Sequence, residues 1–310
     1  MIGIVYIVEK GLLEQQAILL QKSIEKYIAP FNSVKSFACC VRKQFTPSGK
    51  TVKLLEKHGA TYLYKNLNQS FDYFPLCNGI YATSYIESTY PSLKGCLLVD
   101  TDTVFVNALN YQLFEEHSLL IRPVDNKGIG SFGKDDINDE FWQKAYGLFS
   151  EPLPQATMKT SIDRQQIRPY YNSGFIFAKK HLGFFNSWHD DFHRLMVSDI
   201  RTNTNASRHK VDYGFIEQMS ISVTLSKLGF EPHVPSIKYN YPLPFRPRLQ
   251  KRESQKVALG DLIHLHYHRW FQHPDFLAYI FSEEDKKSES FSWLESECNF
   301  VPKIYDSFKC

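Results

Sequence analysis

The feature that most constrains this 310-residue chain is the alternation of short apolar runs with helix-like stretches over its first hundred residues. Residues 2–8 form a continuous β-branched run, which is typical of a strand buried on both faces. Residues 12–28 carry apolar side chains at helical spacing, and Pro30 follows to end the helix. The same alternation predicts further strands at 34–41, 61–64 and 95–99, and further helices at 51–58 and 75–90.

Strands that alternate with helices in units of this length predict an α/β fold. We expect a Rossmann-like, mostly parallel sheet flanked by helices on both faces. Ligands of such sheets bind at the carboxyl ends of the strands. The predicted strand at 95–99 runs directly into Asp100, so the sequence places this aspartate at the ligand-binding edge.

The pattern changes after a predicted strand at 118–122. Residues 125–170 are rich in glycine, acidic residues and proline, with one predicted helix at 138–149. An insertion this long is often a lid or an acceptor loop, or else it is disordered. Beyond it we predict a strand at 175–178, helices at 182–200 and 213–228 with Gly229 as C-cap, and a last strand at 262–268. The apolar stripe of the helix at 182–200 is expected to be core.

Composition excludes some classes of protein. A net charge of +3 is weak for a non-specific nucleic-acid binder, so no nucleic-acid partner is expected. Six cysteines without a C-x-x-C pair are typical of reduced thiols in a cytosolic protein. No apolar run approaches the roughly 20 residues of a spanning helix, and the first ten residues do not resemble a signal peptide. We therefore expect a soluble, cytoplasmic protein.

A basic segment could bring the protein to a membrane surface. Residues 238–252 interleave aromatic residues and prolines with Arg246, Arg248, Lys251 and Arg252. These side chains would face an anionic acceptor, such as a lipid-linked or phosphorylated glycan. The alternative is a solvated basic loop.

Two carboxylates follow the strand at 95–99, in the stretch LLVDTDTVFV. Residues i and i+2 of an extended chain project to the same side, so Asp100 and Asp102 can converge on one cation. Their hard oxygen ligands suit Mn²⁺ or Mg²⁺, and a diphosphate leaving group needs such a cation because charge builds on it. One alternative is a solvated turn. Another is the first motif of a haloacid-dehalogenase-type phosphatase, in which Asp100 would be the nucleophile and Lys134, Asp135 and Asp136 the later residues.

Three histidines alternate in the predicted last strand, at His264, His266 and His268. This spacing points all three side chains to one face of a strand. One or two of them could bind a metal, because neutral imidazole is a common ligand. The alternatives are buried structural histidines or a self-contained zinc site, although no cysteine supports the latter.

Four short motifs in this order resemble glycosyltransferases of the GT-A fold. They are LLVDTDTVFV, YYNSGFIFAKK, DYGFIEQ and IHLHYHRWF. The sequence is most similar to the family of glycogenin and lipopolysaccharide galactosyltransferases, glycosyltransferase family 8, over roughly residues 2–270. This resemblance implies a GT-A-type catalytic domain at 1–270, with a nucleotide-binding half at 1–122 and an acceptor-side half at 123–270. Residues 271–310 would be a C-terminal extension.

The resemblance also implies the roles of individual residues. The metal ligands would be Asp100, Asp102, His264 and His266. Residues at the donor would be Tyr6, Val8, Val99, Asp100, Thr101, Asn172, Ser173 and Arg269. Arg269 stands near the place of the family's diphosphate-binding lysine, in a stretch that departs from the family pattern. The stretch Asn172-Ser173-Gly174 could alternatively be a turn that enters a strand.

The catalytic candidates implied by the resemblance are Asp212 and Gln218. If the reaction inverts the anomeric carbon, Asp212 would take the acceptor proton, and if it retains the configuration, either residue would hold the sugar. Asp212 could alternatively cap the helix that follows.

The function implied is that of a hexosyltransferase. The chain would move a sugar from a nucleoside-diphosphate sugar, most simply a UDP-sugar, to a glycan, glycolipid or protein, with Mn²⁺ or Mg²⁺ as cofactor. The remaining alternative is a non-catalytic nucleotide- or glycan-binding module that has only the fold.

Overall fold

The computed structural model describes residues 1–28, 33–200, 215–298 and 300. These residues form two compact units, each assembled from separate stretches of the chain. The first unit comprises Met1–Leu67, Val99–Leu113 and Pro235–Cys310, and the second comprises Asn68–Leu98 and Phe114–Val234. The contiguous halves at 1–122 and 123–270 and the extension at 271–310 stay predictions.

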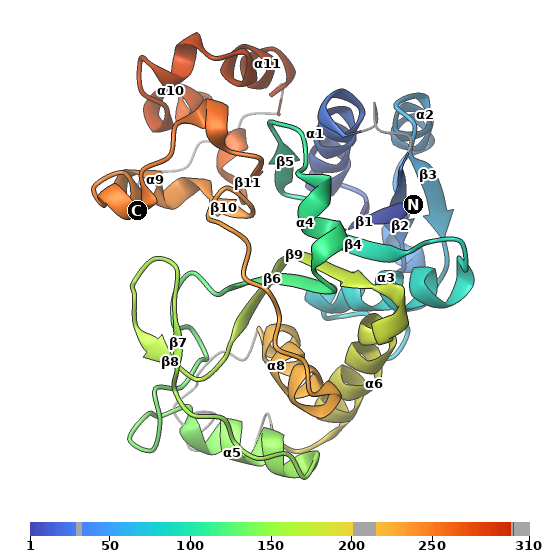
Figure 1. The fold of residues 1–310 in the computed structure, drawn as a ribbon. Coiled ribbons are helices and arrows are strands. Elements are labelled where there is room, and N and C mark those ends of the chain that lie inside the picture. Colours follow the sequence, from blue (N-terminus) through green and yellow to red (C-terminus); the bar gives the residue numbers. More distant parts are fainter. Residues whose placement is uncertain (29–32, 201–214, 299, 301–310) are drawn as a thin grey trace. The chain divides into compact units, whose positions relative to one another are not determined.

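The first unit contains three parallel strands and their connecting helices (Figure 1). Its elements are β1 (Ile2–Ile7), α1 (Leu12–Tyr27), β2 (Val34–Cys40), α2 (Gly49–Lys57), β3 (Thr61–Tyr64), β5 (Thr103–Phe105), α4 (Tyr111–Glu116, ending in the second unit), β10 (Tyr241–Pro242), α9 (Arg246–Leu249), β11 (His264–His266), α10 (Phe276–Ile280) and α11 (Glu289–Glu297). The predicted strands and helices of residues 2–64 are confirmed to within two residues at every end. Pro30, which was expected to end the first helix, lies outside the described residues.

A second, smaller sheet in the first unit brings distant segments together. Its strand order is β10-β11-β5, and β11 runs antiparallel to β5. Helix α1 packs against β5, and the backbone N–H of Phe105 donates to the Ser23 hydroxyl at 3.1 Å. The tail of the unit also packs on α1, since Lys22 pairs with Glu297 at 2.6 Å.

The second unit contains strands in the order β4-β9-β6, with β6 antiparallel to β9. Its elements are α3 (Asn78–Thr89), β4 (Gly95–Val99), β6 (Leu119–Pro123), α5 (Asp139–Leu148), β7 (Met158–Lys159), β8 (Gln166–Ile167), β9 (Tyr171–Lys179), α6 (Phe184–Val197) and α8 (Ile216–Leu228). Helices α6 and α8 pack on β9 and on each other. Gly229 caps α8 in the left-handed conformation, with φ of 65°. The α/β class is therefore confirmed, with strands and flanking helices in both units.

The apolar stripe of α6 is core, as predicted. Phe185, Trp188, Phe192 and Leu195 are all buried, and the indole N–H of Trp188 donates to the Ser220 hydroxyl at 2.8 Å. Each such side chain contributes about 1.5–3 kcal/mol by leaving water.

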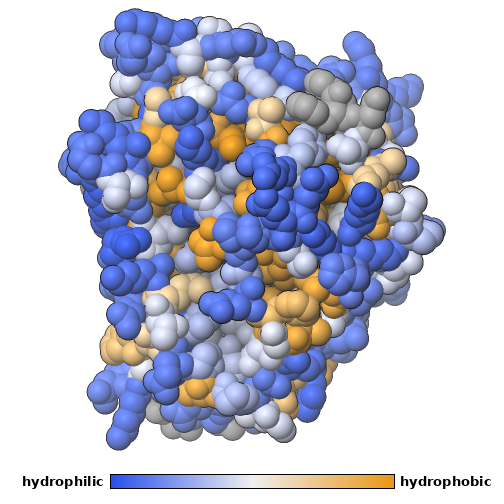
Figure 2. Space-filling view, viewed as in Figure 1, coloured by the Kyte–Doolittle hydropathy of each residue, from blue (hydrophilic) through white to orange (hydrophobic). Residues whose placement is uncertain are grey.

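On the face drawn in Figure 2, hydrophobic residues occur in patches separated by hydrophilic ones.

Residues 125–170 are more ordered than the predicted irregular insertion. Besides α5 they contain the hairpin of β7 and β8. Trp142 is fully buried, meets Tyr170 edge to face at 5.7 Å, and donates its indole N–H to the Ile129 carbonyl. Residues 125–170 thus contain buried aromatic packing, which their glycine and proline content did not predict.

Five of the six cysteines lie in the described residues and are free thiols, whereas Cys310 lies outside them. Among the described helices, none is long and apolar enough to cross a membrane.

Candidate metal and donor site

The Asp-Thr-Asp segment forms a turn between β4 and β5. The hydroxyl of Thr101 donates to the Ile7 carbonyl at 2.6 Å, which ties the turn to the carboxyl end of β1. The backbone N–H of Tyr267 donates to the Asp102 carbonyl at 3.1 Å, which ties it to the end of β11. Two anchors from distant segments therefore fix the turn at the edge of the first unit's parallel strands.

The register of β5 and β11 decides which histidine meets the acids. His266 lies opposite Thr103, next to the turn, whereas His264 lies opposite Phe105. Two residues along a strand correspond to roughly 6.6 Å. His264 is fully buried with its ring 4.6 Å from the Phe105 ring. The structure thus places His266 beside the acids and His264 in the core.

Three side chains form a cluster that could hold a metal ion, and we name it the metal cluster: Asp102, His266 and His268. His266 Nε2 lies 3.2 Å from Asp102 Oδ1, and His268 Nδ1 lies 3.7 Å from Asp102 Oδ2. Asp100 is more distant, with Oδ2 3.8 Å from His266 Nε2. The cluster confirms that the Asp-Thr-Asp turn and the histidine strand meet, but it contains His268 rather than His264.

The geometry of the metal cluster fits one cation. One ligand atom from each side chain lies within 4.8 Å of the other two. Ligand atoms about 2.1 Å from one ion are at most about 4.2 Å apart, so only small movements are needed to close the site. The side chains of Asp100 and Asp102 are 42% and 28% exposed to solvent, which leaves room for a phosphate group to reach them.

The electrostatics keep one acid ionised. Burial would raise the pKa of Asp102, but the charge of His266 and hydrogen bonds from His266 and His268 hold that pKa well below its usual range. Partial burial raises the pKa of Asp100 above its usual range. The charge of His266 lowers this pKa, and the charge of Asp102 raises it. Burial lowers the pKa of His268, and the charges of His266 and Arg269 add to this effect. A neutral imidazole and an ionised carboxylate are the states in which these groups bind metals.

The donor residues expected in the first unit divide into core and surface positions. Tyr6, Val8 and Val99 are at most 1% exposed, and the Tyr6 hydroxyl donates to Gln21 Oε1 at 2.9 Å. Their side chains belong to the core, and the expected position of these residues at the donor stays a prediction. Thr101 is nearly buried and anchors the turn. Arg269, by contrast, is exposed and directly follows the metal cluster in sequence.

The candidates of the second unit lie on β9 and α8. Asn172 and Ser173 are half-buried residues of β9, so the alternative of a turn before the strand is wrong. The Asn172 side chain accepts the backbone N–H of Gly174 at 2.8 Å. Gln218 is a nearly buried residue of α8. Asp212 lies outside the described residues, and the N-cap position of α8 belongs to Phe215.

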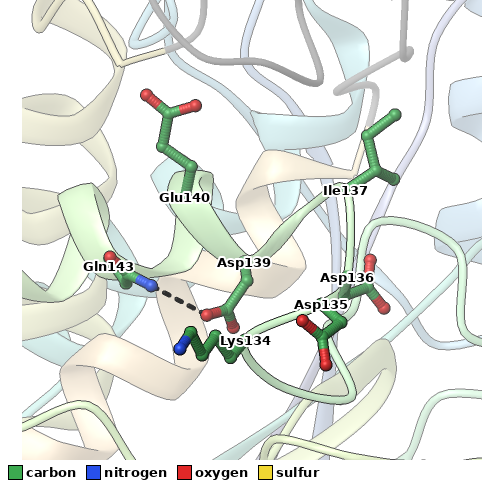
Figure 3. Close-up of a pocket in the computed structure, with 7 residues that line it drawn as sticks. All are labelled: Lys134, Asp135, Asp136, Ile137, Asp139, Glu140 and Gln143. Carbon is green, nitrogen blue, oxygen red and sulfur yellow. Dashed lines mark hydrogen bonds between the residues drawn. The ribbon is translucent and has the colours of Figure 1, made fainter.

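A hollow of about 370 Å³ in the second unit is lined by acidic residues (Figure 3), and we name it the acid hollow. Its lining residues are Lys134, Asp135, Asp136, Ile137, Asp139, Glu140 and Gln143. Two of these acids already bind cationic side chains, since Asp136 pairs with Lys127 at 2.9 Å and Asp139 with Arg168 at 2.8 Å. Asp136 also accepts the backbone N–H groups of Phe132 and Asn138. It holds this loop together, which argues against the role it would have in a phosphatase.

The basic segment is not uniformly exposed. Arg246 is buried, donates to Asp285 Oδ2 at 2.7 Å, and also reaches the Val257 carbonyl. The expectation that all four basic side chains face an acceptor is therefore wrong for Arg246. Arg248 and Lys251 are exposed.

Sequence reasoning missed two residues of this site. His268 was part of the observed histidine alternation, but the resemblance favoured His264, and only the strand register distinguishes them. Gln16 donates its side-chain N–H to the His268 carbonyl at 3.2 Å. No motif marks Gln16, because the contact joins α1 to a segment 252 positions away.

One protein-family model matches most of the chain. The family model described as "Rhodobacterales glycosyltransferase domain" matches residues 4–229. This range includes the Asp-Thr-Asp turn but not the histidines of β11. No curated protein matches the chain. Among solved structures, the chain is similar to mouse xyloside xylosyltransferase 1 in its apo form, with 13% identity over 86% of this chain and 98% of that chain. The TM-score of this match is 0.46.

Proposed function

The chain belongs to the family of Rhodobacterales glycosyltransferase domains, and from this premise we propose that it is a metal-dependent, nucleotide-sugar glycosyltransferase. The donor would be a nucleoside-diphosphate sugar, most simply a UDP-sugar. The acceptor would be a hydroxyl group of a glycan, glycolipid or protein. The observation that carries the proposal is the meeting of Asp102 with His266, two residues from distant segments of the first unit.

The residues of the site fit Mn²⁺ or Mg²⁺. Asp102, Asp100 and His266 would hold the ion, with the carboxylate of Asp102 as the strongest anionic ligand. When bound, such an ion neutralises negative charge on a leaving diphosphate. The anchoring of the turn to β1 and β11 fixes the carboxylates in advance, so little reorganisation is needed when the donor binds.

Other residues would orient the donor. Arg269 is exposed beside the metal cluster, and its planar guanidinium pairs well with phosphate oxygens. For Asn172 and Ser173 at the donor sugar, and for Asp212 and Gln218 in catalysis, the support is the sequence resemblance alone. We retain these roles as part of the proposal.

The test compares Asp102→Ala with a matched control, Asp261→Ala, which changes an exposed aspartate shortly before β11. Purified variants are incubated with a panel of UDP-sugars, with Mn²⁺ or with EDTA, and release of UDP is measured. We expect Asp102→Ala to lose about 10²- to 10³-fold of the metal-stimulated turnover, as for the removal of one transition-state stabiliser. The control should keep wild-type turnover.

The alternatives give different results in the same assay. Full turnover in Asp102→Ala would discard the mechanism. Tight UDP-sugar binding by the wild type without any turnover would instead identify a binding module. Release of phosphate from aryl phosphates with Mg²⁺ would identify a phosphatase.

A further inference from the structure

We infer that His268 is a further metal ligand beside Asp102, Asp100 and His266, so that two imidazoles bind the ion together with the carboxylates and the site selects a divalent transition metal over Mg²⁺. The inference rests on the proposed metal site and deepens it. It concerns a residue whose role neither the sequence resemblance nor the matched range of the family supplies.

The first argument is the way in which the two rings share one carboxylate. His266 faces Oδ1 of Asp102 and His268 faces Oδ2, at 3.2 and 3.7 Å. The two ring centroids are 4.0 Å apart and the rings are tilted by 38°. The lone pairs of both rings can therefore be directed at the ion that Asp102 binds.

The second argument is the backbone that turns His268 towards the cluster. Strand β11 ends at His266, and Tyr267 points into the core, where its ring stacks on Phe271 at 3.9 Å. His268 then adopts a left-handed conformation with φ of 55°. This conformation costs a residue with a Cβ atom roughly 1–2 kcal/mol, and glycine would avoid that cost. The chain nevertheless has histidine here, which is the pattern expected where function requires a side chain.

The third argument is a support for this turn from another element. Gln16 on α1 is 4% exposed and donates its side-chain N–H to the His268 carbonyl at 3.2 Å. Helix α1 also packs against β5, the strand that follows Asp102. Gln16 is therefore a positioning residue that holds His268 at the metal cluster.

The ligand set decides which ions bind. Mg²⁺ prefers oxygen ligands in near-ideal octahedral geometry and keeps several waters. Imidazole nitrogens favour transition metals, with affinity rising from Mn²⁺ to Co²⁺ and Ni²⁺. A site in which two imidazoles bind beside the carboxylates should therefore bind Co²⁺ more tightly than Mn²⁺, and Mg²⁺ most weakly.

The test measures metal binding to the whole protein without nucleotide, by calorimetry with Co²⁺, Mn²⁺ and Mg²⁺. The variant is His268→Gln, and the matched control is His273→Gln, which changes a partly exposed histidine five residues along. We expect His268→Gln to weaken Co²⁺ binding about 10- to 100-fold, in the range seen when support of a metal site is lost. Mg²⁺ binding should change much less, and the control should behave as the wild type.

A spectroscopic measurement counts the ligands directly. Pulsed electron paramagnetic resonance of the Mn²⁺-loaded protein should detect two imidazole nitrogens in the wild type and one in His268→Gln. Gln16→Met keeps the size of the side chain but removes its donor N–H, and it should weaken the coupling of the second nitrogen at unchanged thermal stability. A purely structural role of Gln16 would instead lower the stability and leave both couplings.

The outcomes separate this inference from the proposed function. One nitrogen in the wild type, or unchanged Co²⁺ affinity in His268→Gln, would overturn the role of His268. If Asp102→Asn still abolishes metal binding in that case, the proposed function stands without His268. If Asp102→Asn also binds metal normally, both proposals fail.

Discussion

The metal cluster and the acid hollow are both rich in acids, and they differ in what faces the carboxylates. In the acid hollow, Lys127 and Arg168 pair with Asp136 and Asp139 at 2.9 and 2.8 Å. In the metal cluster, Asp102 faces the imidazoles of two histidines. Lysine and arginine carry a permanent charge that neutralises a carboxylate, whereas a neutral imidazole adds a lone pair for the same cation. We therefore propose the metal site from the group that faces the carboxylate, and not from the number of acids.

Solvent exposure separates the two places further. The side chains of Asp139 and Arg168 are 3% and 8% exposed, so their ion pair is closed. Those of Asp102 and His268 are 28% and 38% exposed. The acid hollow is therefore expected to affect stability, and the metal cluster to affect ligand binding.

The largest effect on stability is expected from Arg168→Met in the second unit. This change leaves the buried carboxylate of Asp139 without its cationic partner, which typically costs about 3–5 kcal/mol. The free energy of unfolding is measured by urea denaturation, and Lys159→Met, at an exposed position of β7, serves as the control. A loss below about 1 kcal/mol would mean that the pair is not the structural unit described here.

Metal addition should stabilise the protein through the metal cluster. At a Mn²⁺ concentration of about 100 times the dissociation constant, linkage predicts about 2.7 kcal/mol, which EDTA should reverse. Thermal unfolding should show this gain in the wild type and in Glu140→Gln, a variant of the acid hollow. Asp102→Asn should not show it. The proposed difference between the metal cluster and the acid hollow is contradicted if Mn²⁺ fails to stabilise Glu140→Gln, or if it still stabilises Asp102→Asn.

Acid should weaken the acid hollow by a smaller, graded amount. Burial would raise the pKa of Asp139, but hydrogen bonds from Arg168, Ser131 and Gln143 lower it below its ordinary value. Its stabilisation is therefore complete above the unfolded pKa of about 4 and is lost as the pH falls through the folded pKa. Unfolding free energies measured from pH 6 down to pH 2 should fall less steeply in Asp139→Asn than in the wild type. Equal slopes would show that another group controls the acid response.

The smallest effect is expected at the rim of the acid hollow. Lys144 pairs with Glu140 at 2.9 Å one helical turn away on α5, and both side chains are about one-third exposed. Exposed pairs of this spacing contribute about 0.3–0.5 kcal/mol. Lys144→Ala should therefore change the unfolding free energy by no more than this, and the change should shrink in 1 M salt. A loss of several kcal/mol would show that this exposed pair contributes as much stability as the buried pair of Asp139 and Arg168.

Most of the local structure could be predicted because the patterns that encode it are local. The strands at 61–64 and 95–99 were predicted with their observed ends, and Gly229 was correctly predicted to cap a helix. The observed ends of an element differ from the predicted ones where a capping residue, and not the apolar periodicity, sets the end. Helix α2 starts at Gly49 because the Ser48 side chain accepts the backbone N–H of Thr51. Strand β11 has only three residues, since the chain turns at His268.

The sequence predicted which two segments form the candidate site, but not which histidines belong to it. The sequence indicated that the Asp-Thr-Asp turn and a histidine strand provide the ligands, and the structure brings Asp102 and His266 within 3.2 Å. Which histidines take part depends on the pairing of β11 with β5, and no single segment encodes that register. The same holds for Arg246, whose burial against Asp285 could not be seen in a run of basic residues.

By itself, the sequence determined the order of strands and helices, the carboxylates at a strand end and the histidines at period two, because each depends on residues close together in the chain. Only the tertiary structure decided that His264 packs against Phe105 while His266 and His268 face Asp102. The physical reason is that a shift of two residues along a strand moves a side chain by roughly 6.6 Å, more than the reach of a metal–ligand bond. Such a position is fixed only when the partner strand is in place.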